Sequence, residues 1–146
     1  NERLLVQQGT ENPLTIWKEM GAWMTEHVTV VRHNKNLEKA DAKLQELIER
    51  YKQINVADRT MWSNQTLNFV RELYNMLILA RVITLGALAR NESRGAHYKP
   101  DFPERDDANW LKTTRAHWEN GPIKLKYEAV DTSLLPPRAR RYDVAK

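Results

Sequence analysis

The sequence predicts a mainly α protein: an antiparallel three-helix bundle followed by a charged loop, a small β-hairpin and an extended tail. Three observations predict it. Apolar residues recur at helical spacing as far as about residue 90, charge is concentrated around residue 100, and apolar and polar residues then alternate. We expect one domain, with a lead-in segment at 1–12, the bundle at 13–92, and the loop, hairpin and tail at 93–146.

The composition describes one globular domain of a water-soluble type. With 146 residues, 41% hydrophobic and 29% charged, the chain is long enough to bury one core. The absence of cysteine excludes disulfides, thiolate metal sites and cysteine nucleophiles, and fits a reducing compartment. No apolar run reaches the roughly 20 residues of a membrane span, so no transmembrane segment is expected. Because the chain begins at Asn1 rather than methionine, we expect a processed or excised piece.

The charge pattern argues against nucleic-acid binding. The net charge is only +4, and acids and bases alternate until the tail, where Arg138, Arg140 and Arg141 cluster. Nucleic-acid binders gather basic residues on one face instead. We interpret the tail as solvated, with an acidic partner or lipid headgroups as the alternative.

Asn12 and Pro13 predict the start of the first helix, because asparagine caps helices and proline fits their first position. An apolar stripe at three- and four-residue spacing comes next: Ile16, Met20, Trp23, His27 and Val30. The second helix has the most regular stripe in the chain. Its members are Leu37, Ala40, Leu44, Leu47, Tyr51 and Ile54.

Ser63 or Asn64 can cap a third helix that runs to about Arg90. It carries two apolar faces, one at 67, 70, 74, 77, 81 and 85, the other at 69, 73, 76, 80, 83 and 87. A helix that is apolar on two faces is covered on two sides. We therefore place it at the centre of the bundle, as in a spectrin repeat.

After residue 109 the period changes from 3.6 to 2. Residues 110–118 are rich in threonine and tryptophan, and apolar residues alternate with charged ones from Ile123 to Ala129. The Asn120-Gly121 pair between these runs is a strong turn signal, so we predict a hairpin.

The segment 90–111 is the densest in charge and is interrupted by glycine and proline, so it predicts a loop. An oxygen-rich metal site from His97, Asp101, Glu104, Asp106 and Asp107 is disfavoured, because the spacing matches no calcium loop and bases are interspersed. The chain also lacks a Gly-rich phosphate loop and a nucleophile elbow. Alone, it does not look like an enzyme.

The order of residues in this segment is a specific signal. Residues 92–97 read Glu-Ser-Arg-Gly-Ala-His, residues 101–107 read Asp-Phe-Pro-Glu-Arg-Asp-Asp, and residues 109–111 read Asn-Trp-Leu. This string closely resembles the C-terminal domain of the flavoprotein subunit of succinate dehydrogenase and fumarate reductase. The resemblance extends from about Pro13 to the Pro-Pro-Arg tail. L-aspartate oxidase is less similar, since only the first part matches.

The resemblance implies that the full subunit is an oxidoreductase of the tricarboxylic acid cycle and electron transport. It would convert succinate to fumarate, or the reverse, on a covalently bound FAD, and electrons would pass through an iron–sulfur subunit to quinone in a membrane anchor. The fragment itself would hold no FAD, no metal and no catalytic residue. It would dock on its own flavin-binding domain, peripheral to the cytoplasmic or matrix face of the energy-conserving membrane.

Within this resemblance, Gly95 would supply a backbone turn, and Arg94 and Arg105 would make forked hydrogen bonds. Phe102 and Trp110 would anchor the loop in apolar surface. Whether the partners lie in this domain or on the flavin domain is open. The candidate domain-interface or loop-ordering residues are Glu92, Ser93, Arg94, Gly95, His97, Asp101, Phe102, Arg105, Asp106, Asp107 and Trp110. The alternative function is a free-standing helical adaptor that binds a protein through the 90–111 loop.

Overall fold

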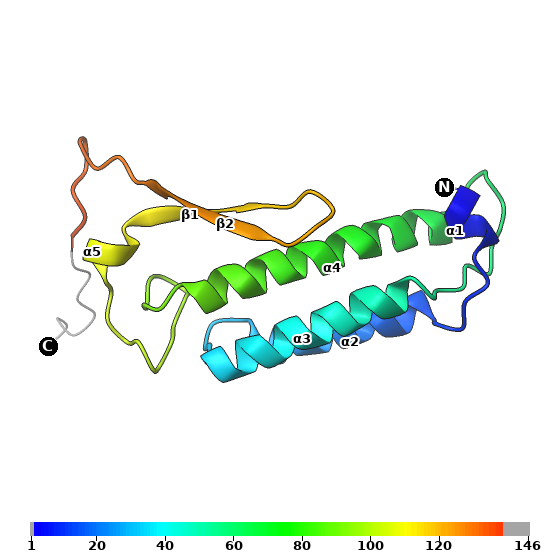
Figure 1. The fold of residues 1–146 in the computed structure, drawn as a ribbon, viewed down its shortest axis with the longest axis horizontal. Coiled ribbons are helices and arrows are strands. Elements are labelled where there is room, and N and C mark those ends of the chain that lie inside the picture. The colour runs from blue at the N-terminus through cyan, green and yellow to red at the C-terminus, as the bar shows by residue number, and fades with distance from the viewer. Residues whose placement is uncertain (1, 139–146) are drawn as a thin grey trace, which may run out of the picture. The chain divides into compact units, whose positions relative to one another are not determined.

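Helices account for most of the regular secondary structure, and a small hairpin follows them (Figure 1). The computed structural model describes residues 2–138. In chain order the elements are α1 Glu2–Val6, α2 Pro13–His27, α3 Asn34–Tyr51, α4 Gln65–Ala89, α5 Asp107–Trp110, β1 Lys112–His117 and β2 Lys124–Ala129. The predicted mainly α class with a hairpin is confirmed. The chain forms two compact units, Asn1–Asp106 and Asp107–Lys146, and Arg140 and Arg141 lie outside the described residues.

The lead-in segment is more ordered than its sequence indicates. It contains the short helix α1 and then pairs with the chain after α3, through bridges from Gln8 to Asn55 and from Glu11 to Ile54. Gly9 permits this approach, because a Cβ at that position would lie 1.7 Å from the Gln53 carbonyl oxygen.

The predicted cap of α2 is confirmed, since Asn12 Oδ1 accepts a hydrogen bond of 2.9 Å from the Leu14 N–H and Pro13 takes the first helical position. The predicted extension of its stripe to Val30 is wrong, because the helix ends at His27. Val30 instead lies in the link to α3, where its carbonyl accepts from the Tyr98 N–H at 3.1 Å.

The stripe of α3 is buried as predicted. The helix itself packs on both α2 and α4 (Figure 1). Tyr51 ends the helix, and its hydroxyl donates to the Val70 carbonyl of α4 at 2.7 Å. Ile54 is fully buried but lies beyond the helix. The chain reverses direction between α2 and α3 and again between α3 and α4 (Figure 1).

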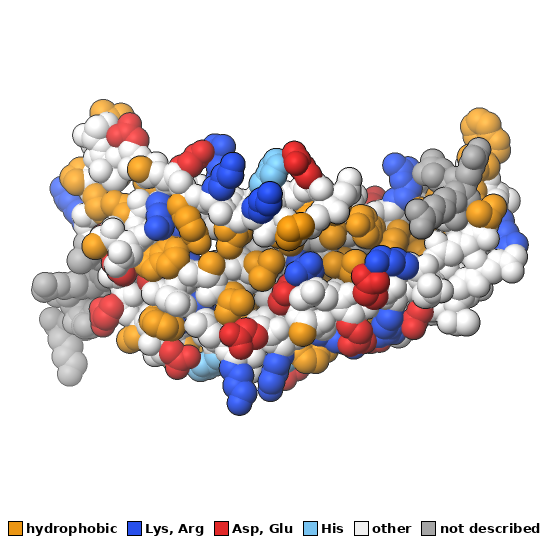
Figure 2. Space-filling model, viewed as in Figure 1, with side chains coloured by type: hydrophobic (Ala, Val, Ile, Leu, Met, Phe, Trp, Pro, Cys, Tyr) orange, Lys and Arg blue, Asp and Glu red, His pale blue; other side chains and the backbone are white. Residues whose placement is uncertain are grey.

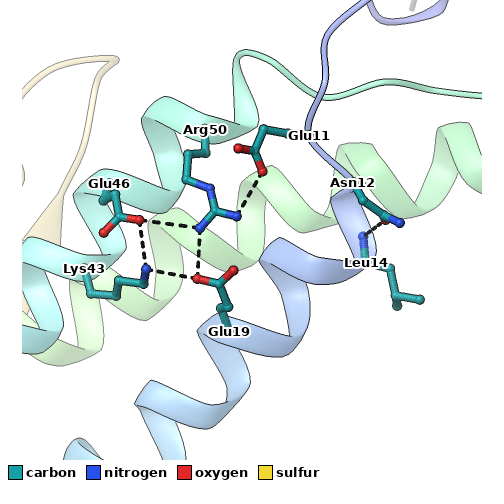
Figure 3. Close-up of polar contacts among 7 residues, drawn as sticks. All are labelled: Glu11, Asn12, Leu14, Glu19, Lys43, Glu46 and Arg50. Atoms are coloured by element: carbon teal, nitrogen blue, oxygen red, sulfur yellow. Dashed lines mark hydrogen bonds and ion pairs between the residues drawn. The ribbon is translucent and has the colours of Figure 1, made fainter.

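Charged side chains also join α2 to α3 (Figure 3). Arg50 of α3 reaches Glu11 before α2 and Glu19 within α2, each at 2.9 Å. Lys43, two turns earlier on α3, binds the same Glu19 carboxylate at 2.9 Å and Glu46 at 2.8 Å. Hydrogen bonds from Arg50 and Lys43 hold the pKa of Glu19 below its usual range.

Asn64 rather than Ser63 caps α4, since its Oδ1 accepts from the Leu67 N–H at 2.7 Å. Both predicted faces contribute to the buried side of this helix, Leu67, Val70 and Leu77 from one and Leu73, Ala80 and Ala87 from the other. Ile83 on the second face is 44% exposed, and Leu79, which lies outside both faces, is 57% exposed. Figure 2 shows hydrophobic side chains gathered along α4.

By length and composition α4 is the one helix among the described residues that could cross a membrane. The central helix of a bundle has the same composition. Two observations favour that second interpretation. Arg81 in its middle pairs with Asp41 of α3 at 2.7 Å, and its apolar stripe packs on α2 and α3.

In the second unit the predicted hairpin is confirmed. Strands β1 and β2 pair antiparallel from Lys112 opposite Ala129 to His117 opposite Lys124, and Asn120 in the turn has a φ of +51°. The sequence did not indicate α5. Trp110 was expected in the strand but ends this short helix.

Candidate functional site: the charged loop

The charged loop, residues 90–106, begins where α4 ends. Lys99 closes that end of the helix, because its Nζ donates to the Leu88 carbonyl oxygen and to Asn91 Oδ1, both at 3.0 Å. The Lys99 side chain is fully buried. Burial, and secondarily the nearby Arg32 guanidinium, lowers the pKa of Lys99 to about 8.

Glu92 is the buried anion of the loop, with no exposed surface. Its carboxylate accepts from Arg90 at 2.5 Å, from two nitrogens of Arg94 at 2.9 Å and from the Asp106 N–H at 3.0 Å. Burial raises the pKa of Glu92, but the hydrogen bonds from Arg94, Asp106 and Arg90 together outweigh it and hold the pKa below its usual value. An ionised Glu92 therefore ties both ends of the loop to one point.

Ser93 folds the middle of the loop back on itself. Its N–H donates to the Glu104 carbonyl at 3.1 Å, and its hydroxyl donates to the Phe102 carbonyl at 2.8 Å. The same hydroxyl oxygen accepts from the Lys99 N–H at 2.9 Å. The hydroxyl thus fixes the backbone at Lys99 and Phe102, and the Ser93 N–H fixes it at Glu104.

A tight turn separates Arg94 from His97, which exchange backbone hydrogen bonds of 2.8 and 3.0 Å. Gly95 within it has a φ of +59°, a conformation that residues with a side chain rarely adopt. The sequence prediction of a glycine turn past the end of the third helix agrees with this geometry, since α4 ends at Ala89.

His97 connects the loop to the link between α2 and α3. Its Nδ1 lies 2.6 Å from Arg32 Nη1 and its Nε2 lies 3.0 Å from the Arg90 carbonyl oxygen. A carbonyl only accepts and a guanidinium only donates, so these partners require a neutral ring protonated on Nε2. Burial lowers the pKa of His97, and the charges of Arg32, Lys99 and Arg90 lower it further.

Other side chains of the loop face outward. Tyr98 and Phe102 are 42% and 36% exposed, and Asp101, Glu104 and Arg105 are exposed as well. The Asp101 carboxylate lies 3.6 Å from His33 Nδ1. The loop therefore has a closed inner side and an open outer side with both aromatic and charged groups.

The last two candidates belong to the second unit. Asp107 begins α5, and Trp110 ends it with its ring edge against Tyr127 of β2, at 5.7 Å between centroids. Lys112 Nζ lies 4.8 Å from the Trp110 ring and 4.6 Å from the Tyr127 ring. The three side chains form one cluster on the hairpin.

The sequence did not single out Arg32 or Lys99 as structural residues. Arg32 follows the apolar stripe predicted for the first helix, and Lys99 lies between the motif segments 92–97 and 101–107. Neither belongs to a periodic pattern. A lysine shortly after a helix C-terminus is a weak signal on its own, because such residues are usually solvated.

The chemistry of the site is that of a folded, ion-paired loop. In the part of the chain that the structure describes, no group of three or more His, Cys, Asp or Glu side chains is placed to hold a metal ion. The buried groups already bind one another, so the inner side offers no open position for a ligand.

Comparison with known proteins identifies the family of this chain. The model of the fumarate reductase flavoprotein C-terminal family matches residues 17–142. The chain belongs to this family. The predicted resemblance is thereby confirmed.

Named relatives of this family are subunits of oxidoreductases. The chain is 56% identical to the succinate dehydrogenase flavoprotein subunit of Bacillus subtilis, over 98% of the chain and 25% of that protein. It is 39% identical to the fumarate reductase flavoprotein subunit of Haemophilus influenzae, over 97% of the chain and 24% of that protein. The chain thus spans about a quarter of the length of the curated relatives it matches.

Solved structures of other proteins share the fold of this chain. The FrdA chain of a mutant Escherichia coli quinol fumarate reductase has a TM-score of 0.87 and 37% identity, covering 92% of this chain and 24% of that one. The adenylylsulfate reductase of Archaeoglobus fulgidus has a TM-score of 0.73 at 19% identity, which shows a common fold alone.

Proposed function

We propose that this chain is the C-terminal structural and docking domain of a succinate dehydrogenase flavoprotein subunit. The full subunit would interconvert succinate and fumarate on FAD, and an iron–sulfur subunit would carry the electrons to quinone at a membrane anchor. The names of the relatives support this proposal, with a higher identity to the succinate dehydrogenase of Bacillus subtilis than to the fumarate reductases. Family membership also argues against the adaptor and L-aspartate oxidase alternatives.

The observation that carries the docking role is the two-sided charged loop. Its inner side is held by Glu92, Ser93, His97 and Lys99, so its shape does not depend on a partner. Its outer side is left exposed in a fixed conformation, which lowers the entropic cost of binding. We infer that the inner residues order the loop and that the outer residues contact the flavin-binding domain.

The helices would serve as the scaffold for this loop. In our proposal α2, α3 and α4 form the three-helix bundle of the family. The link between α2 and α3 then positions Arg32 to bind His97. The exposed apolar side of α4 would be covered by the rest of the subunit rather than by lipid. The subunit would then lie at the cytoplasmic or matrix face of the membrane as a peripheral component.

FAD is implied by the family, and the residues of this chain do not fit it. Its five glycines, at positions 9, 21, 86, 95 and 121, form no Gly-rich phosphate loop. The cations of the charged loop are already bound, Arg90 and Arg94 to Glu92 and Lys99 to the Leu88 carbonyl. We therefore assign flavin binding to polypeptide outside this chain and route no chemical step through it.

The docking role is tested on the outer side of the loop. Phe102→Ser in the full flavoprotein subunit should lower its Tm by a few °C, because an apolar contact is lost, while the isolated chain keeps its Tm. Leu14→Ser, at a similar exposure of 45% on α2, is the matched control. Equal changes in Tm for the full subunit and the isolated chain would exclude the loop as the docking surface.

A further inference from the structure

The loop between α3 and α4 presents two apolar side chains to solvent. Trp62 is 89% exposed and Met61 is 55% exposed. They lie near the start of α4, whereas the charged loop follows its end. A tryptophan and a methionine this exposed are unusual on the surface of a soluble domain and typical of protein interfaces.

Hydrogen bonds hold this loop in one conformation. Asn64, only 5% exposed, donates to the Asp58 carbonyl at 2.7 Å and to the Thr60 carbonyl at 2.9 Å while it caps α4. Thr60 in turn donates from its N–H and its hydroxyl to Asp58 Oδ1, at 3.0 and 2.8 Å. The exposure of Trp62 therefore does not come from a loosely held loop.

The backbone at Ser63 is strained as well. Its φ is +53°, in the left-handed region that residues other than glycine rarely adopt. Such strain persists where the surrounding structure over-determines it, and it concentrates at functional positions. Here it directly follows Trp62, so the strained residue helps to set the direction in which the indole points.

One basic side chain, Arg59, lies on the same loop as Met61 and Trp62. Arg59 is exposed and lines a hollow of about 370 Å³ with Leu5, Val6 and Gln8. The neighbouring Asp58 carboxylate is already bound by Thr60. A matching surface would offer an apolar pocket for the indole and a carboxylate at its rim for Arg59.

We propose that Met61 and Trp62 anchor this domain to the remainder of its own flavoprotein subunit, in an apolar pocket with an acidic rim. This inference rests on the proposed function. It adds a second contact with the rest of the subunit, in addition to the contact through the charged loop. The chain spans about a quarter of its relatives' length, so the rest of such a subunit is present at a high effective concentration. That makes it the favoured occupant over a separate subunit, a second copy or a membrane.

Oxidation of Met61 tests the proposal in the full flavoprotein subunit. Hydrogen peroxide oxidises exposed methionines, and peptide mass spectrometry gives the rate at each site. We expect Met61 to react about tenfold more slowly in the folded, flavin-loaded subunit than in the same subunit unfolded in urea. Met20, which is 8% exposed, is the buried reference.

Variants separate anchoring from general stability. Trp62→Ser and Arg59→Glu should each speed Met61 oxidation several-fold without changing the rate at Met20. Leu134→Ser, a similar apolar-to-polar change at a side chain 96% exposed, should leave both rates unchanged.

Three results would overturn the proposal. Met61 could react at its unfolded rate in a subunit that keeps its flavin and its activity, which would leave the proposed function intact. Protection could arise only when the iron–sulfur subunit is added, which would assign the surface to that partner. Protection could also arise only with lipid vesicles, which would assign it to a membrane.

Discussion

Arg32 and His97 lie 65 positions apart in the chain, yet Arg32 Nη1 lies 2.6 Å from His97 Nδ1. The contact works only with a neutral imidazole, since the other ring nitrogen faces the Arg90 carbonyl. It joins the charged loop to the link between α2 and α3, where the Arg32 N–H also donates to the Tyr98 carbonyl at 2.8 Å. The position of the loop therefore depends on the protonation state of one histidine.

The first prediction comes from the lowered pKa of His97, whose facing charges are Arg32, Lys99 and Arg90. With a folded-state pKa below the usual 6.5, the unfolded chain binds the proton more readily. The stability contributed by neutral His97 is thus complete above pH 6.5 and is lost as the pH falls through its folded-state pKa. The loss is at most about 1.4 kcal/mol per pH unit.

Urea unfolding between pH 7.5 and pH 5 measures this loss. His97→Asn should show a shallower fall in the free energy of unfolding than the wild type. His33→Asn, at a side chain that is 43% exposed, is the matched control for the loss of a histidine. Identical slopes in all three proteins would rule out His97 as the responsible group.

The second prediction concerns the buried carboxylate. Glu92→Gln keeps the side-chain volume but leaves Arg90 and Arg94 without their anion, so the free energy of unfolding should fall by about 3 kcal/mol. Glu104→Gln removes an exposed charge from the same loop and should change it by less than about 0.5 kcal/mol. Chemical denaturation at pH 7 compares the two, and a similar small effect in both would contradict the buried role.

Periodicity and capping rules predicted the helical part of the fold. The α3 stripe, the Asn12 cap and the Asn120-Gly121 turn depend on neighbours within a few residues, which the sequence displays. The end of α2 at His27 was missed, because the link from α2 to α3 is held by backbone pairing with Tyr98, far along the chain.

The same limit applies to the charged loop. The motif identified the loop and its family, but composition could not show which acid would be buried. Glu92 is buried because two arginines and the Asp106 N–H converge on it, and Lys99 because the open carbonyl of Leu88 faces it. These contacts depend on which groups meet in the folded chain. The spacing of neighbouring residues in the sequence does not predict them.

The third prediction uses the lowered pKa of Lys99, about 8 against the usual 10.5. Between these values the unfolded chain holds a proton that the folded chain has lost. The free energy of unfolding should therefore rise with pH in this window, by at most about 1.4 kcal/mol per unit. Lys99→Met should remove this rise, while Lys39→Met on the exposed side of α3 should retain it. Denaturation from pH 7.5 to 10 measures it, and a rise that survives in Lys99→Met would refute the assignment.

The fourth prediction concerns the ion pairs between α2 and α3. A double-mutant cycle of Arg50→Met and Glu19→Gln should give a coupling of about 0.5–1 kcal/mol at low salt, reduced at high salt because the pair is partly exposed. The Lys52–Glu49 pair, with side chains 57% and 69% exposed, should show a smaller coupling in the same cycle. No coupling between Arg50 and Glu19 at low salt would mean that this ion pair does not stabilise the fold.

The fifth prediction compares three glycines in different settings. Gly95→Ala meets no neighbouring atom but must adopt a φ of +59°, so it should cost about 1 kcal/mol. Gly86→Ala lies inside α4 with open space around it and should instead stabilise the protein by about 0.5–1 kcal/mol. Gly9→Ala would place a methyl group against the Gln53 carbonyl oxygen and should detach the lead-in segment from the end of α3.

Thermal unfolding gives the sign of the change at each glycine, and hydrogen exchange of the Glu11 and Asn55 amides reports the local detachment expected for Gly9→Ala. Slow exchange retained at both amides would show that the lead-in segment can shift to accept a side chain. A gain in stability at Gly95 would mean that the turn from Arg94 to His97 does not need the left-handed backbone. The inner side of the charged loop would then be less rigid than the docking role requires, because Arg94 and His97 are held in register by that turn.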